Sequence, residues 1–135
     1  MRIALALALS LSFTPACASD ELPGEDPGAV CDTTLSYEGD VAPIVDRYCG
    51  NCHARQVPLT ERHGAPGDRD FDDEADVLAH AERITRRAGV GPAAENRSMP
   101  PRGFRAPSDE ERSILASFLA CHLESSASGA PHHHH

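Results

Sequence analysis

The stretch that decides the fold is Cys49-Gly50-Asn51-Cys52-His53, two cysteines separated by two residues and followed at once by a histidine. This spacing is the attachment pattern of c-type haem. The two thiols would add to the porphyrin vinyl groups as thioethers, and sulfurs about one helical turn apart suit neighbouring edges of one ring. His53 would then lie under the ring and supply a nitrogen to the iron. The motif therefore predicts one covalently bound haem c.

Three other interpretations of the same residues explain less. A thioredoxin-like dithiol shares the two-residue spacing, but it belongs in a βαβ context that this chain does not suggest. A zinc site needs four ligands, and Cys31 and Cys121 are isolated in the sequence. A disulfide between Cys49 and Cys52 would be geometrically tight and leaves His53 without a role.

Length and composition favour a small domain built around a prosthetic group. The 135 residues allow a single domain with tails, and aromatic residues make up 4% with no tryptophan. A domain of this size usually needs a staple or an internal group, and a buried porphyrin would serve as its core. The formal charge of −9 argues against nucleic acid as a partner. It suits docking on basic proteins, although an acidic surface is also simply a soluble one.

Residues 1–18 read as a signal peptide. Arg2 is a minimal basic region, an apolar run follows it, and Ala16-Cys17-Ala18 fits the small-x-small cleavage rule. The apolar run is too short to span a bilayer comfortably. Cys17 has a second interpretation as the lipidated cysteine of a bacterial lipoprotein, although the residues before it are a poor version of that signal. Both interpretations predict export to the periplasm or to the outer face of a bacterial membrane, with a lipid at Cys17 as the one membrane contact.

The two ends of the mature chain look unstructured. Residues 19–36 are rich in Pro, Gly, Asp and Glu, which predicts a flexible N-terminal arm, and residues 125–135 predict a disordered tail. The four terminal histidines suit either a tag or a natural tail and are left out of the site. Cys31 and Cys121 form an even pair, so a disulfide would pin the arm to the last helix in an oxidising compartment. Two free buried thiols are the alternative.

Helical periodicity appears in three segments. A first helix begins at Tyr37, with Asp40 as a plausible N-cap, and its apolar stripe leads into the motif. A second is expected from about Asp73 to Ala88, with Gly89 as its stop and His80 on the surface. A third begins at the capping box of Ser108 and Glu111 and runs to about Leu123. The apolar stripes comprise Val41, Ile44, Val45 and Tyr48; Val77, Leu78, Ala81 and Ile84; and Ile114, Leu115, Phe118 and Leu119.

Two loop-like segments lie between these helices. Residues 54–74 contain His63, which is expected to be a solvated histidine although it could in principle be a second iron ligand. Residues 89–107 contain Met99-Pro100-Pro101. Met99 is the only methionine outside the signal peptide, and a lone methionine in a polar loop is an odd packing residue. A thioether ligand must be held rigidly, and two prolines would do that.

The assembled pattern resembles the class I c-type cytochromes, and more narrowly the single-haem cytochrome c domains of exported bacterial proteins. The resemblance covers residues 37–124. It is carried by Val41, Pro43, Ile44, Cys49, Cys52, His53, Arg83, Ile84, Met99, Pro100, Pro101, Glu110, Glu111, Arg112, Leu115, Phe118 and Leu119.

The resemblance implies an all-α class I cytochrome c fold, with three to four helices around one covalently bound haem. It implies His53 as proximal ligand and Met99 as distal ligand, a combination that raises the reduction potential. A proline carbonyl, here Pro58 or Pro66, would accept the proximal imidazole's N–H. Candidates for contact with the haem propionates are Arg83, Arg97, Arg102 and Arg105.

The implied function is electron transfer by Fe(III)/Fe(II) cycling, with redox proteins as partners and no enzymatic activity, because both axial positions are filled. The alternative is a haem-based sensor, or a protein that binds a gas or peroxide, in which Met99 is labile.

Overall fold

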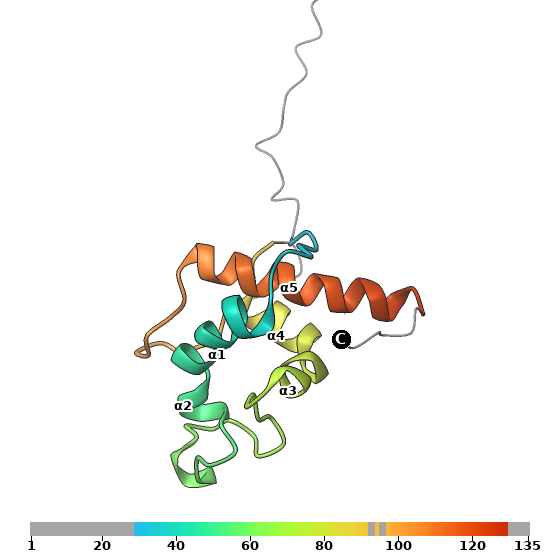
Figure 1. Cartoon of the computed structure of the whole chain (residues 1–135). Coiled ribbons are helices and arrows are strands. Elements are labelled where there is room, and N and C mark those ends of the chain that lie inside the picture. Colours follow the sequence, from blue (N-terminus) through green and yellow to red (C-terminus); the bar gives the residue numbers. More distant parts are fainter. Residues whose placement is uncertain (1–28, 92–93, 95–96, 130–135) are drawn as a thin grey trace, which may run out of the picture.

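The computed structural model describes residues 29–91, 94 and 97–129, and all regular elements in these ranges are helical (Figure 1). The predicted all-α class is confirmed at this level. The expected signal peptide with Cys17, residues 19–28 of the arm and the terminal histidines lie outside the described residues. None of the described helices has the length and apolar character needed to cross a membrane.

Seven helical elements follow one another along the described chain. They are η1 (Tyr37–Val41), α1 (Ala42–Tyr48), α2 (Gly50–His53), η2 (Leu59–Glu61), α3 (Glu74–Ala79), α4 (Ala81–Ala88) and α5 (Asp109–Ala127). Of these, η1 is a π-helical turn and η2 is a 3₁₀ turn. The expected loop character of residues 54–74 and of the residues described within 89–107 holds apart from η2 and the start of α3 at Glu74.

The first helical segment begins where the periodicity predicted, but its cap was assigned to the wrong residue. Ser36 is the N-cap of η1, and its hydroxyl accepts the N–H of Gly39 at 3.2 Å. The Asp40 carboxylate instead accepts the N–H of Ser36 at 2.8 Å and its hydroxyl at 3.0 Å. Asp40 therefore supports the cap from inside the helix. Cys49 separates α1 from α2, so the motif continues the same helical path.

The helix expected from Asp73 to Ala88 is two helices. Asp73 was expected as the approximate start of the helix; it is the N-cap of α3, and its carboxylate accepts the N–H of Asp76 at 2.9 Å. The path breaks at His80, whose N–H donates to the carbonyl of Val77. His80 is half-buried rather than on the surface, and its ring meets that of Phe71 edge-on at 5.7 Å between centroids. The apolar spacing runs through the break and therefore does not reveal it.

Helix α5 starts at the predicted capping box. The Ser108 hydroxyl accepts the N–H of Glu111 at 3.1 Å, and the Glu111 carboxylate accepts the N–H of Ser108 at 2.8 Å. The helix ends at Ala127, so residues 125–127 are helical although the disordered tail was expected to begin at residue 125. Within this last part of the helix the hydroxyls of Ser125 and Ser126 each donate to a carbonyl one turn earlier, at 2.8 and 2.9 Å.

The core lies under α5, with η1 and α4 packed against this long helix (Figure 1). Its buried members are mostly small and medium-sized aliphatic residues: Val41, Val45, Phe71, Val77, Ala81, Ile84, Ala88, Leu115 and Leu119. Phe71 is the one aromatic side chain among them. The expected scarcity of large side chains in the interior therefore holds within the described residues.

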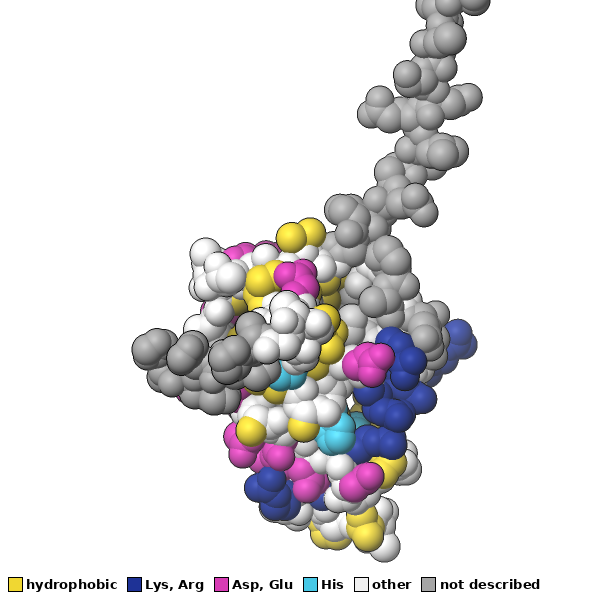
Figure 2. All heavy atoms as spheres, turned by 90° about the vertical axis from the view of Figure 1, so that its right-hand side faces the viewer, with side chains coloured by type: hydrophobic (Ala, Val, Ile, Leu, Met, Phe, Trp, Pro, Cys, Tyr) yellow, Lys and Arg dark blue, Asp and Glu magenta, His cyan; other side chains and the backbone are white. Residues whose placement is uncertain are grey.

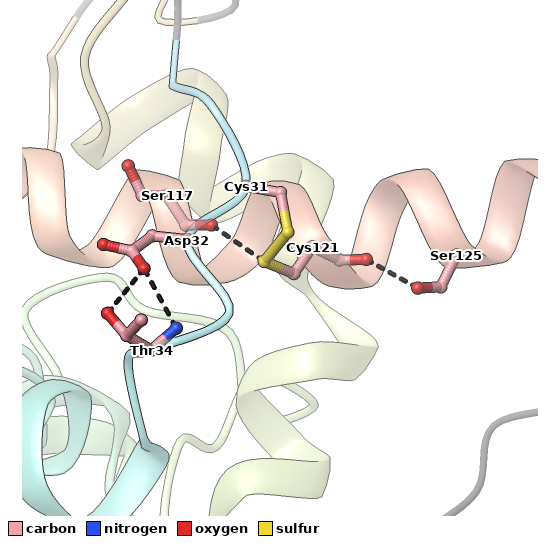
Figure 3. The surroundings of a disulfide bond; sticks show 6 residues. All are labelled: Cys31, Asp32, Thr34, Ser117, Cys121 and Ser125. Atoms are coloured by element: carbon pink, nitrogen blue, oxygen red, sulfur yellow. Dashed lines mark hydrogen bonds between the residues drawn. A yellow bond between two sulfur atoms is a disulfide. The ribbon is translucent and has the colours of Figure 1, made fainter.

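A disulfide joins Cys31 to Cys121, as the cysteine count suggested, with the two Cα atoms 4.5 Å apart (Figure 3). It fixes the described end of the arm against α5. Next to it the Asp32 carboxylate accepts the N–H of Thr34 at 2.9 Å and its hydroxyl at 2.6 Å. Residues 31–36 are thus tied to the helical domain by covalent and hydrogen bonds.

We expect replacement of both Cys31 and Cys121 with serine to lower the free energy of unfolding by about 4 kcal/mol. The bridge joins residues 90 positions apart, and cutting it returns the entropy of a long loop to the unfolded chain. Denaturant unfolding of the full-length protein measures the change. Either single serine variant should lose the same amount, and an unchanged unfolding midpoint in the double variant would contradict the expectation.

Candidate functional site

One pocket, with a cavity volume of about 260 Å³, gathers the residues that the sequence singled out. Its walls come from α1 and α2, the loop 54–71, α4 and the segment 99–107 that precedes α5. Cys49, Cys52, His53 and Met99 all line it. Ile44, Ile84, Ala88 and Leu115 contribute aliphatic surface to the same walls. The motif and the methionine, 46 residues apart in sequence, thus face one cavity.

The two motif cysteines are free thiols on a single helical turn. The N–H groups of Cys52 and His53 both donate to the carbonyl of Cys49, at 3.0 and 2.9 Å. This turn presents both sulfurs to the pocket. Burial raises the pKa of the Cys49 thiol to about 12, so this side chain is a protonated thiol at neutral pH.

His53 is held in one orientation by the main chain. Its Nδ1 lies 2.8 Å from the carbonyl oxygen of Arg69, and because a carbonyl only accepts, Nδ1 carries the proton in this bond. Nε2 is then left with a free lone pair. Burial lowers the pKa of His53, which favours the neutral imidazole. A neutral ring fixed through Nδ1 is the arrangement found for metal-binding histidines.

The expected acceptor for this imidazole was wrong. Neither Pro58 nor Pro66 receives the proton: the carbonyl of Pro58 accepts the N–H of Glu61 at 2.8 Å, and that of Pro66 accepts the N–H of Arg69 at 3.3 Å. These bonds fold the loop so that the carbonyl of Arg69 faces His53.

Phe71 packs against the face of the His53 imidazole. The two rings are stacked, with centroids 4.4 Å apart and planes 16° from parallel. The N–H of Phe71 donates to the carbonyl of His53 at 2.6 Å, so main chain and ring act together. Nothing in the sequence pattern pointed to this residue, because a single phenylalanine in a charged loop has no periodicity.

Arg62 organises the loop that supplies the Arg69 carbonyl. It is only 4% exposed. Its guanidinium donates to the carbonyls of Val57 and Ala54, at 2.8 and 3.0 Å, and pairs with Asp70 at 2.7 Å. A buried cation is costly unless its N–H groups have partners, and here the loop closes around it to provide them. Sequence reasoning missed this residue because arginine is usually exposed.

Met99 lines the pocket from the segment that follows α4. It is half-buried and packs against the hydrophobic core as well as lining the cavity. Its N–H donates to the carbonyl of Arg87 at 3.0 Å, which ties the segment to the end of α4. Pro100 and Pro101 follow and also line the pocket.

The four arginines proposed from the sequence separate into two pairs. Arg83 and Arg105 line the pocket. Arg97 and Arg102 are exposed and are not among the lining residues, and Arg97 pairs with Asp109 at 2.9 Å.

Other arginines that the sequence did not single out also reach the pocket. All twelve of the chain's Lys and Arg residues are arginine, and those lining the pocket that had no predicted role are Arg47, Arg62, Arg69 and Arg87. The guanidinium groups of Arg47 and Arg105 each lie over the ring of Tyr48, 5.8 Å from its centroid. Most arginines visible in Figure 2 likewise gather on one side of the face drawn.

His63 is exposed, as expected, but it also borders the pocket. Its ring meets the ring of Phe104 edge-on with centroids 5.0 Å apart. This contact joins the loop after α2 to the segment after Met99 at the pocket mouth. His63 is therefore the second histidine that has to be considered beside the cavity.

Comparison of the chain with protein-family models, with curated proteins and with solved structures finds no match.

Proposed function

We propose that the chain is an exported electron-transfer protein that carries one haem c, attached through Cys49 and Cys52, with His53 and Met99 as axial ligands. The observation that carries the proposal is that these four side chains, chosen from the sequence alone, line the same cavity. An arbitrary helical fold would have no reason to bring a lone methionine to the motif.

The residues present fit the group. Two free thiols on one turn suit thioether bonds to a single ring, and a neutral imidazole with its Nδ1 proton committed to Arg69 offers Nε2 to a metal. The aliphatic walls suit a flat apolar macrocycle. The bordering arginines suit the carboxylates that such a ring carries, with Arg83 and Arg105 the candidates shared by sequence and geometry.

Haem iron supplies a reversible one-electron couple when bound. The protein's part is to fix the two ligands and to surround the ring with apolar side chains. A histidine–methionine pair and a water-poor pocket both favour the reduced state. Because His53 and Met99 would both be used to hold the iron, no substrate would bind to it, so we assign a carrier rather than an enzyme, with redox proteins as its partners.

Export is part of the same proposal. The disulfide of Cys31 and Cys121 suits an oxidising compartment, which agrees with the signal peptide expected at residues 1–18. We place the protein in the periplasm or on the outer face of a bacterial membrane.

We expect Met99→Leu to abolish the weak sulfur–iron absorption band of the ferric protein at the red end of the spectrum and to lower the reduction potential. Leucine keeps the volume of the side chain but removes the sulfur. A visible spectrum with a redox titration measures both effects.

His63→Ala is the matched control, because this histidine also borders the pocket and could occupy the iron instead. It should leave the band intact. A band that survives Met99→Leu, or a high-spin spectrum in the unmodified protein, would favour the sensor or peroxide-binding alternative.

We expect the double variant Cys49→Ser, Cys52→Ser to contain no covalently attached haem. Either single variant keeps one thiol and should retain one thioether bond. The mass of the denatured polypeptide reports the attachment. The double variant Cys31→Ser, Cys121→Ser is the control, since it removes two other cysteines and should keep its haem; full haem retention without Cys49 and Cys52 would refute the attachment.

A further inference from the structure

The segment that carries Met99 has no regular secondary structure among its described residues, so contacts with the rest of the fold decide where the sulfur lies. Two hydrogen bonds hold the main chain of Met99. Its N–H donates to the carbonyl of Arg87 at 3.0 Å, and its carbonyl accepts from Nη1 of Arg112 at 3.3 Å. One residue is thus held at both of its polar main-chain atoms.

Arg112 belongs to the first turns of α5 and is only 6% exposed. The same Nη1 donates to the carbonyl of Ala88 at 2.6 Å. Ala88 is the last residue of α4, where carbonyls have no partner within the helix. A single guanidinium nitrogen therefore joins the end of α4 and the main chain of Met99 to α5.

A second arginine connects the same segment to α5, but in a different setting. Arg97 pairs with Asp109 at 2.9 Å, and the two side chains are 50% and 81% exposed. Exposed ion pairs contribute little because water competes for both partners. The buried guanidinium of Arg112 has no water to replace a lost acceptor, so its hydrogen bonds contribute more than the exposed ion pair of Arg97.

We infer that Arg112 is a positioning residue that keeps Met99 directed into the pocket and thereby sets how readily the thioether leaves the iron. The inference rests on the proposed function, because it concerns the strength of the proposed distal ligand. Arg112 touches neither the iron nor the ring in this account and acts only through Met99 and the end of α4.

Imidazole binding to the ferric haem-loaded protein tests the inference. This neutral ligand can bind only where Met99 has left the iron, so its apparent affinity rises with the fraction of molecules in which the segment is open. We expect Arg112→Gln to bind imidazole about tenfold more tightly than the unmodified protein and to show a weaker sulfur–iron band.

Two further variants serve as controls. One tests whether the effect comes from the loss of a positive charge, and the other guards against a failure of Arg112→Gln to fold. Arg97→Gln removes an equal charge, from the segment that carries Met99, and its imidazole affinity should stay within about twofold of the unmodified protein. Arg112→Lys keeps the charge and one donor group, so it should fold even if Arg112→Gln does not, and its affinity should fall between those of the unmodified protein and Arg112→Gln.

The outcomes are distinguishable. An unmodified protein with the sulfur–iron band, together with an Arg112→Gln variant of unchanged band and imidazole affinity, overturns the inference alone. If only Arg112→Lys folds, an affinity equal to that of the unmodified protein overturns it. An equal rise in Arg97→Gln would assign the effect to charge and also overturn it. An unmodified protein without the band overturns the proposed ligation and the inference with it.

Discussion

The carboxylate of Glu111 is the point through which α5 is fixed to the helix that leads into the motif. It completes the capping box with Ser108 and also accepts the hydroxyl of Tyr48, at 2.8 and 3.1 Å to its two oxygens. Hydrogen bonds from Ser108 hold the pKa of this carboxyl below its usual value, so it is an acceptor over the whole neutral range. Because Tyr48 directly precedes Cys49, the start of α5 sets the position of the first thiol.

Other residues of α5 connect it to α4, to the segment of Met99 and to the N-terminal arm. Arg112 donates to the carbonyls of Ala88, at the end of α4, and of Met99. Leu115 and Leu119 are buried in the core. Cys121 holds the N-terminal arm through its disulfide with Cys31. One long helix therefore contacts the residue before the motif, the segment of Met99 and the N-terminal arm. The core around it is built of Val, Ala, Leu and Ile with a single phenylalanine, which leaves room for a cavity instead of closing over it. A flat group in that cavity would supply the contacts that large side chains provide elsewhere.

The sequence predicted those features whose signal lies in side-chain identity and spacing. The capping box of Ser108 and Glu111, the stripes of the helices and the pairing of Cys31 with Cys121 are all of this kind, and the structure confirms them. The convergence of His53 and Met99 on one cavity followed from the same reasoning.

The features that the sequence could not predict depend on the main chain and on tertiary contacts. The carbonyl of Arg69 is an acceptor that any residue could offer, and only the fold of the loop selects it over Pro58 and Pro66. The break at His80 and the burial of Arg62 and Arg112 have no local signature, since apolar spacing continues through the first and arginine ordinarily lies in water.

The two sides of the pocket are held with different strength, and this bears on what the protein does. On one side the imidazole of His53 is fixed by the Arg69 carbonyl, the stacked ring of Phe71 and the loop closed around Arg62. On the other side Met99 is held mainly through its own main chain, in a segment without helix. Any exchange of ligand would therefore begin at Met99 and leave His53 in place. Under the proposed ligation, a carrier and a ligand-binding haem protein would differ in how often the segment of Met99 is open. An external ligand can bind only to the open molecules, so its apparent affinity follows their fraction. In this chain a buried arginine and the last turn of α4 hold the main chain of Met99. Under the proposed ligation these bonds would keep the open population low and favour a carrier.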